Sequence, residues 1–464
     1  MIPLDRKTGR KRQNTNLLLK SENNRKKMEN NIEERTLELA LKNSDSAEVI
    51  YEKGESRSIS FENNKLKSVY TKSIRGIGLR VIKNGKIGFS STTDFRKPEQ
   101  LVTNAIESAE FGQEAKFEFQ SKNQYKDTKL FDENVVDYPI EKGIQIGKDN
   151  IEKALSVNPD YECGVSIGKG SSKGRLINSS GLDTSSRSTS FGSSIDILLV
   201  KDKGLLWIGE GESSVKVVDD LDKHTTKALR DLKLAEKEVE IPTAGYPIVF
   251  TSKAAGNLLS TFESGCNGKL VQKGVSPLTG KLGEKMLDER FSMYDDPTID
   301  YADGSYVCDD EGVSARRTPL FESGVLKNYI FDLQTAGIMN TKSTGNGTRS
   351  FASQPSPGNS NLIIEPGDMK FEDMIKDMKS GILVDQVLGG GQSNVLAGEF
   401  SVNIDLGYFV ENGEIVGRVK DCMVAGNVFD AFNNIIALGD KSDWHGSLKV
   451  PPFYFRSINV AGNS

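Results

Sequence analysis

Histidine and cysteine, the residues that most often hold catalytic metals, are scarce in this chain. Its 464 residues include two histidines, His224 and His445, and four cysteines. A catalytic zinc site usually needs three protein ligands, two of them close together in one helix. The histidines lie 221 positions apart, and we expect His224 on a surface helix and His445 in a loop. The residues therefore indicate no zinc site.

The cysteines are scattered, with no C-x-x-C pair and no short framework spacing, so reduced thiols are the simplest expectation. No apolar run approaches the roughly 18 residues that span a bilayer. The opening segment holds only a three-leucine apolar patch, whereas a secretory signal peptide needs an apolar core of about 7–15 residues. We therefore expect a cytoplasmic protein without a membrane partner.

Positive charge is in excess only in the first residues, an asymmetry that the net charge of −5 for the whole chain hides. Residues 1–28 carry nine lysines and arginines against two carboxylates, a net +7 that leaves −12 on the remainder. We interpret residues 1–28 as a basic disordered tail, and a basic arm that binds nucleic acid is the alternative. The acidic body matches a phosphate backbone poorly, which disfavours nucleic acid as a partner.

The length of the chain predicts more than one domain, and its composition is ordinary for a globular protein. The first predicted unit, residues 29–115, is an N-terminal layer of helices and strands. We expect helices at 31–44 and 97–112, and Asn84-Gly85 between apolar runs predicts a hairpin.

The rest of the chain is predicted to be rich in strands. Residues 116–240 form a middle antiparallel unit with turns of Gly, Ser and Asp, and with helices at 138–157 and at about 219–236. Residues 241–464 show one strand–helix step and then many strands. The predicted fold class is therefore α+β and multi-domain, with a strand-rich, barrel-like C-terminal domain around an internal helix.

The densest group of charges is the segment CDDEGVSARR at 308–317. Its carboxylates could bind a hard cation or act as acid and base, and its arginines could hold a carboxylate. The alternative is a tight acidic turn at Gly312, with the arginines in ion pairs along the next strand. The substrate-binding candidates in this segment are Asp309, Asp310, Glu311, Arg316 and Arg317.

A glycine-rich loop, LGGGQSN at 388–394, does not have the strand–loop–helix spacing of a phosphate-binding loop. We interpret it as a flexible wall that an extended backbone can approach closely. Its three glycines are further substrate-binding candidates: Gly389, Gly390 and Gly391.

The internal helix is predicted at 252–264, directly after the strand-like YPIVFT. Ser252 is a plausible N-cap, and small and apolar residues form one stripe along the helix. A closely packed helix of this kind is a usual place for a catalytic metal site. This one presents Ser260, Thr261 and Glu263, and no histidine.

Many segments, in order along the chain, resemble the TldD/PmbA family. They include YPIVFTSKAAGNLLSTFESGCNG, DDEGVSARRTPLFESGVLKNYIFD, VLGGGQSNVLAGEFSV and the closing INVAG. The resemblance runs from about Glu29 to the C-terminus and is most specific over residues 241–462. It implies a cytoplasmic peptidase subunit of a family historically called modulators of DNA gyrase. Members are of a TldD type, with a His-Glu-x-x-x-His metal motif, or of a TldE (PmbA) type without it.

Aligned with the TldD pattern, this chain has replaced every metal ligand and the general base. The first His and the Glu correspond to Ser260 and Thr261, the second His to Gly265, and a Cys ligand near the C-terminus to Leu448. Hydroxyl groups cannot substitute for imidazoles on zinc, because they are neutral and much weaker donors. The resemblance therefore implies a TldE-type chain with no catalytic residues of its own.

The same resemblance implies the partners and cofactors. We expect no cofactor in this chain, zinc or another divalent metal in a TldD-like partner, a heterodimer or larger complex, and a homodimer when the chain is isolated. The expected substrates are unfolded peptides or small proteins. Two alternatives stay open: an independent hydrolase with a divalent cation at the acidic 308–311 segment, and a regulator associated with nucleic acid.

Overall fold

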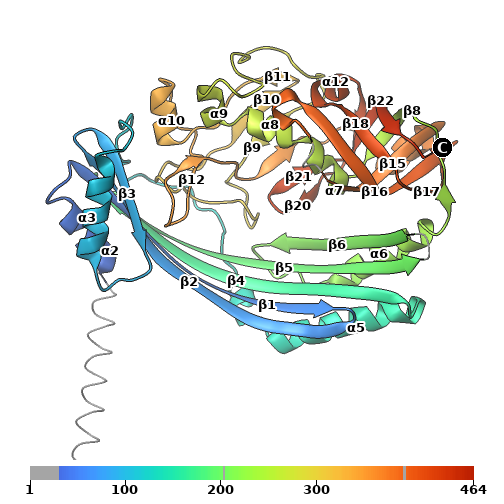
Figure 1. Ribbon diagram of the computed structural model, residues 1–464, viewed down its shortest axis with the longest axis horizontal. Coiled ribbons are helices and arrows are strands. Elements are labelled where there is room, and N and C mark those ends of the chain that lie inside the picture. Colours follow the sequence, from blue (N-terminus) through green and yellow to red (C-terminus); the bar gives the residue numbers. More distant parts are fainter. Residues whose placement is uncertain (1–30, 202–203, 390–392, 464) are drawn as a thin grey trace, which may run out of the picture.

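The computed structural model describes residues 31–201, 204–389 and 393–463, so the predicted basic tail lies outside it. The fold is α+β, as predicted. A long curved antiparallel sheet lies beneath a strand-rich C-terminal part that contains a closed barrel (Figure 1). No helix in these three ranges is long and apolar enough to cross a membrane.

The first sheet has six antiparallel strands in the order β3-β2-β1-β4-β5-β6. They are β1 (Ser46–Glu62), β2 (Lys65–Lys83), β3 (Lys86–Thr92), β4 (Tyr161–Asn178), β5 (Asp183–Lys201) and β6 (Gly204–Ser214). Asn84 and Gly85 form the predicted β2–β3 turn, both with positive φ. Because β1 pairs with β4 over most of its length, this one sheet continues across the boundary predicted at residue 115.

Five helices accompany the first sheet: α2 (Ile32–Ala40), α3 (Pro98–Ala109), α4 (Glu133–Asp137), α5 (Ile140–Val157) and α6 (Leu221–Leu234). Four of them correspond to the helices predicted from the sequence. Helices α2 and α3 pack at one end of the sheet, whereas α5 and α6 cover one face of its other part. That face carries apolar residues such as Ile59, Val165 and Ile195. The opposite face of β4 and β5 is rich in serine and glycine.

The C-terminal part confirms the predicted barrel. Strands β15, β8, β22, β18 and β16 pair in that order, and a β15–β16 pairing closes the ring. They are β8 (Ala244–Phe250), β15 (Ser380–Leu388), β16 (Glu399–Glu411), β18 (Met423–Asn427) and β22 (Phe453–Ala461). Three more strands join this sheet outside the ring: β7 (Glu238–Val239), β17 (Glu414–Val419) and β19 (Ile435–Leu438).

A second six-stranded sheet, in the order β11-β10-β9-β14-β21-β20, lies beside the barrel. Its strands are β9 (Met293–Asp295), β10 (Thr318–Glu322), β11 (Val325–Leu326), β14 (Leu362–Ile364), β20 (Asp443–His445) and β21 (Leu448–Val450). A two-stranded sheet joins β12 (Gly347–Thr348) to β13 (Ser356–Pro357). The short helices of this part are α9 (Gly268–Gln272), α10 (Leu333–Ile338), α11 (Phe371–Asp377), η2 (Val395–Ala397) and α12 (Val428–Asn433).

The predicted internal helix is broken into three pieces: α7 (Ser252–Ala255), η1 (Gly256–Leu258) and α8 (Ser260–Gly265). Its N-cap is Thr251, which accepts a hydrogen bond from the Ala254 N–H, and not Ser252 as predicted. The segment is buried in the core, and Phe262 is fully enclosed. Four phenylalanine rings lie 5.1–5.8 Å from the Phe262 ring: Phe291, Phe321, Phe429 and Phe432.

Candidate functional site

The four positions that the family pattern assigns to ligands and base lie around α8. Ser260 is partly exposed and Thr261 is buried. A Cβ atom added to Gly265 would lie 2.8 Å from Leu278 Cδ1. Leu448 packs against the preceding turn, because a Cβ atom added to Gly256 would lie 2.9 Å from Leu448 Cδ2. Leu448, remote in sequence, thus lies against the turn that precedes α8.

The side chains at these positions do not fit the metal that the family implies. They offer no imidazole, carboxylate or thiolate, and Leu278 occupies the space beside Gly265 that an imidazole would need. Glu263 is the one carboxylate on this turn, and burial raises its pKa. A single protonatable carboxylate cannot hold a zinc ion or take the place of the missing ligands.

The predicted acidic candidates face inward. Arg80 donates to Glu311 Oε1 at 2.7 Å and to Glu48 Oε1 at 2.8 Å, and Arg349 donates to the same Glu48 oxygen at 2.6 Å. We call these four residues the sealed cluster, since each side chain is at most 2% exposed. Burial raises the pKa of Glu311, although Arg80 opposes the rise. The cluster joins β1 and β2 to the 308–317 loop.

Asp309 and Asp310 are also engaged with the protein itself. Asp309 accepts backbone N–H bonds from Glu311, Val313 and Gly347, and burial raises its pKa. Asp310 accepts from the Arg349 N–H at 2.8 Å. Gly312 has a φ of 80°, which fits the tight acidic turn that the sequence offered as an alternative.

The remaining candidates lie apart from these carboxylates. Arg316 donates to the Ser343 carbonyl. Arg317 donates to Glu365 at 2.9 Å and lies over the Tyr294 ring. Gly389 is exposed with a φ of 96°, and Gly390 and Gly391 lie outside the described residues.

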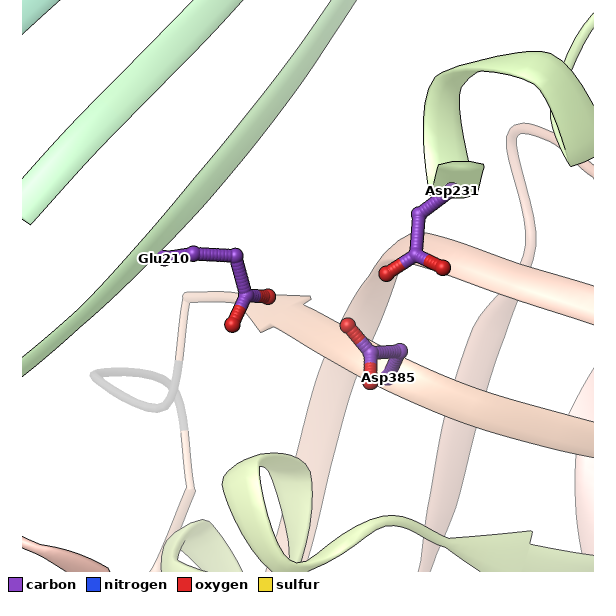
Figure 2. A group of neighbouring side chains, drawn as sticks. All are labelled: Glu210, Asp231 and Asp385. Carbon is purple, nitrogen blue, oxygen red and sulfur yellow. The ribbon is translucent and has the colours of Figure 1, made fainter. Parts of the chain in front are cut away.

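Sequence reasoning missed a second group of charges, which is assembled from three distant elements. The carboxylates of Glu210 on β6, Asp231 on α6 and Asp385 on β15 point toward one another (Figure 2). Their nearest oxygens all lie within 4.8 Å of each other. We call this triad and its two lysines, Lys227 and Lys253, the open cluster. No spacing in the sequence links residues that lie so far apart along the chain.

Two ammonium groups already supply the cations of the open cluster. Lys227 Nζ lies 2.6 Å from Glu210 and 3.2 Å from Asp231, and Lys253 Nζ lies 2.8 Å from Glu210. Burial opposes ionisation of Glu210, but the two lysines outweigh it and lower its pKa. A divalent cation would have to displace both ammonium groups, so the triad is poorly suited to metal binding.

The open cluster borders a cavity of about 1570 Å³ between the first sheet and the C-terminal part. Both histidines line it, although they are remote in sequence. His224 lies in α6, as predicted, but its side chain is only 12% exposed and Nε2 lies 3.5 Å from Glu212. His445 ends the short strand β20 and does not lie in a loop as predicted, and burial lowers its pKa.

Comparison with known proteins defines the class of the chain. Residues 243–462 match the PmbA/TldA metallopeptidase C-terminal domain, and residues 47–109 match the PmbA/TldA metallopeptidase domain 1. An uncharacterized protein of Methanocaldococcus jannaschii is 30% identical over 434 residues, which cover 91% of this chain and 98% of that protein. The chain belongs to the TldD/PmbA family.

Two further relatives differ in how much of the chain they match. A metalloprotease of Methanocaldococcus jannaschii is 33% identical over 213 residues, 46% of each chain. The structure of TldE from Thermococcus kodakarensis superposes with a TM-score of 0.85, covering 93% of this chain and 100% of that one at 23% sequence identity. At 23% sequence identity, the likeness to TldE shows that the two chains share a fold.

Proposed function

We propose that this chain is the metal-free, TldE-type subunit of a metallopeptidase complex that acts on unfolded peptides or small proteins. A TldD-type partner supplies the metal, zinc or another divalent ion, and the general base. The observation that carries the proposal is the set of side chains around α8. Ser260, Thr261, Gly265 and Leu448 stand where ligands and base are expected, and none can perform either role.

Packing supports the same conclusion. Phe262 and the four phenylalanines around it fill the interior beside α8, and Leu278 lies against Gly265. A catalytic metal site requires an open coordination position and polar groups that orient the ligands. Around α8 the chain has built a tight apolar core instead.

A separate partner is supported by the relatives. Methanocaldococcus jannaschii has both a relative that matches nearly this whole chain and a metalloprotease that matches half of it. Two family chains in one organism are what a complex with divided roles requires. We propose that the complex is cytoplasmic and that the isolated chain forms a homodimer.

Elemental analysis of the purified chain tests the metal-free state. We expect no stoichiometric zinc or iron. Close to one tightly held transition metal per chain would contradict the proposal.

A reconstitution assay tests the role of the subunit. This chain alone is expected to cleave peptides at background level, and to restore or raise cleavage when mixed with a TldD-type chain. Changing Ser260→His, Thr261→Glu and Gly265→His together should not create a peptidase, because Leu278 blocks position 265 and a third ligand is missing at Leu448. Robust, chelator-sensitive cleavage by this chain alone would overturn the assignment.

A further inference from the structure

One edge of the first sheet borders the large cavity. Strand β6 is the last strand of that sheet, so no strand among the described residues pairs with its outer edge, although β20 lies close to it without pairing. In Figure 1 it is the strand of the first sheet nearest the C-terminal part. Residues 210–214 of β6 line the cavity, and the turn after β20 lines it nearby.

Side chains of β15 and α7 cover only the start of this edge. The Gly209 N–H donates to Gln386 Oε1 at 3.1 Å, and the Gly209 carbonyl accepts from Lys253 Nζ at 2.6 Å. At the other end, the Val215 N–H donates to the Tyr301 carbonyl at 3.4 Å. The outward backbone groups of this edge therefore have hydrogen-bond partners before and after the stretch that faces the cavity.

Two residues between these ends keep their backbone groups free. Backbone groups point outward at every second residue of a strand, so Gly211 and Ser213 point the same way as Gly209. No described residue forms a hydrogen bond with the outward N–H or carbonyl groups of either one. The edge thus offers two donors and two acceptors in the spacing of a strand.

The two glutamates of this stretch are paired with lysines of the chain. Glu212 pairs with Lys223 at 2.6 Å, and Glu210 is held by the two lysines of the open cluster. Gly211 has no side chain, and the Ser213 hydroxyl donates to Asp303. With both glutamates paired and no side chain on Gly211, the backbone groups of this stretch are accessible for recognition.

The size of the cavity also favours a chain segment over a small molecule. Its volume of about 1570 Å³ exceeds the range of about 300–1,000 Å³ that is usual for small-molecule sites. The lining of the cavity also includes apolar side chains that can contact side chains of the segment. Among them are Leu234, Phe371, Ile375 and Ile415.

We propose that this cavity binds an extended, uncharged peptide segment as an added strand on β6, paired with Gly211 and Ser213. Addition of a strand to a free sheet edge is an established mode of peptide recognition. The biological role of this site rests on the proposed function, since a subunit of a peptidase complex would hold substrate there. The binding itself needs only this chain.

The test is a titration of the full chain with a fluorescein-labelled octapeptide of alternating threonine and valine, followed by anisotropy. Ser213→Pro removes the outward N–H, which an edge strand tolerates. It should weaken binding about tenfold. Ser213→Ala is the matched control, because it loses the contact with Asp303 but keeps the N–H, and should bind like the unaltered chain. The same peptide with all its backbone amides N-methylated should not bind.

Three results would overturn the proposal: no binding of the parent peptide up to about 1 mM, equal binding by the proline and alanine variants, or equal binding of the methylated peptide. If Ser213→Pro does not fold, the comparison of the parent and methylated peptides on the unaltered chain tests the proposal by itself. Metal content and reconstituted cleavage are measured separately. Failure of peptide binding would therefore leave the metal-free subunit role standing, and a metal in the isolated chain would refute that role without touching this site.

Discussion

The sealed cluster and the open cluster both combine carboxylates with basic side chains, but the pKa of a glutamate is raised in the first and lowered in the second. In the sealed cluster no side chain is more than 2% exposed, and burial raises the pKa of Glu311 in spite of Arg80. In the open cluster Lys253 and Lys227 are 26% and 36% exposed, and they lower the pKa of Glu210 although burial opposes this. A dense run of charges along the sequence predicted the first cluster as a site, yet only the second borders a cavity.

Arg80→Met should have the largest effect, because it breaks the sealed cluster at its centre. Glu48 and Glu311 would remain buried without their shared cation. Breaking a buried ion pair in this way costs about 3–5 kcal/mol. Urea unfolding would measure the loss, and a loss below about 1 kcal/mol would show that the cluster relaxes or admits water.

Asp295 is a buried carboxylate whose hydrogen-bond donors are all neutral, so it shows the effect of burial on a carboxylate that has no cationic partner. Its carboxylate accepts only from the neutral groups of Asn346 and Ser360, and burial raises its pKa to about 6. A raised pKa means that the folded chain holds the proton more tightly than the unfolded chain. The stability from this group is therefore fully present below about pH 4 and is lost as the pH rises through about 6.

The expected loss of unfolding free energy from Asp295 is about 3 kcal/mol in all, about 2 kcal/mol of it between pH 4 and 6. Asp295→Asn should remove this part of the pH dependence. Urea titrations at several pH values would measure it, and identical profiles for the two proteins would refute the assignment.

Glu210→Gln should show the opposite pH dependence to that of Asp295, because lysines lower the pKa of Glu210. The stability from Glu210 is present above its ordinary pKa and is lost as the pH falls through the lowered one. At pH 7 the change should cost about 1.5–3 kcal/mol, the value of hydrogen bonds between charged groups. The cost should shrink in acid, and a cost that grows below pH 5 would contradict the charges assigned here.

Arg317→Ala should have the smallest effect. Arg317 is exposed, pairs with an exposed Glu365, and stacks on Tyr294. Exposed ion pairs contribute about 0–1 kcal/mol. A loss of unfolding free energy above about 2 kcal/mol, in thermal or urea unfolding, would mean that Arg317 stabilises the fold by more than its ion pair and its stacking on Tyr294.

Local patterns predicted much of the fold. Sequence patterns located α3 and α5, and the Asn84-Gly85 pair located the turn after β2, where both residues have positive φ. The continuous internal helix was wrong, because Gly256 lets the chain tighten into η1 against Leu448. That contact depends on β21, almost 200 residues later, and no local pattern reports it.

The site was harder to predict than the fold. The carboxylates of 309–311 stand together in sequence, but each has its own partners inside the protein: Glu311 binds Arg80, more than 200 positions earlier, and the two aspartates accept backbone N–H groups. The open cluster collects Glu210, Asp231 and Asp385 from three elements, with no pattern in the sequence. Ionic partners of this kind are set by tertiary contacts, whereas the replaced positions around α8 could be found from the family resemblance.

Closure of the barrel constrains the order in which the chain can mature during synthesis. Strand β8 ends at Phe250 and lies between β15 and β22, and β22 ends at Ala461, 211 residues later. At about 5–20 residues per second, the ribosome needs roughly 10–40 s to supply that last neighbour. Until then one edge of β8 is unpaired and the apolar face of α8 lacks part of its cover. A ribosome-bound chain that stops before β22 should therefore be cut readily by protease near α7, and the finished chain should resist.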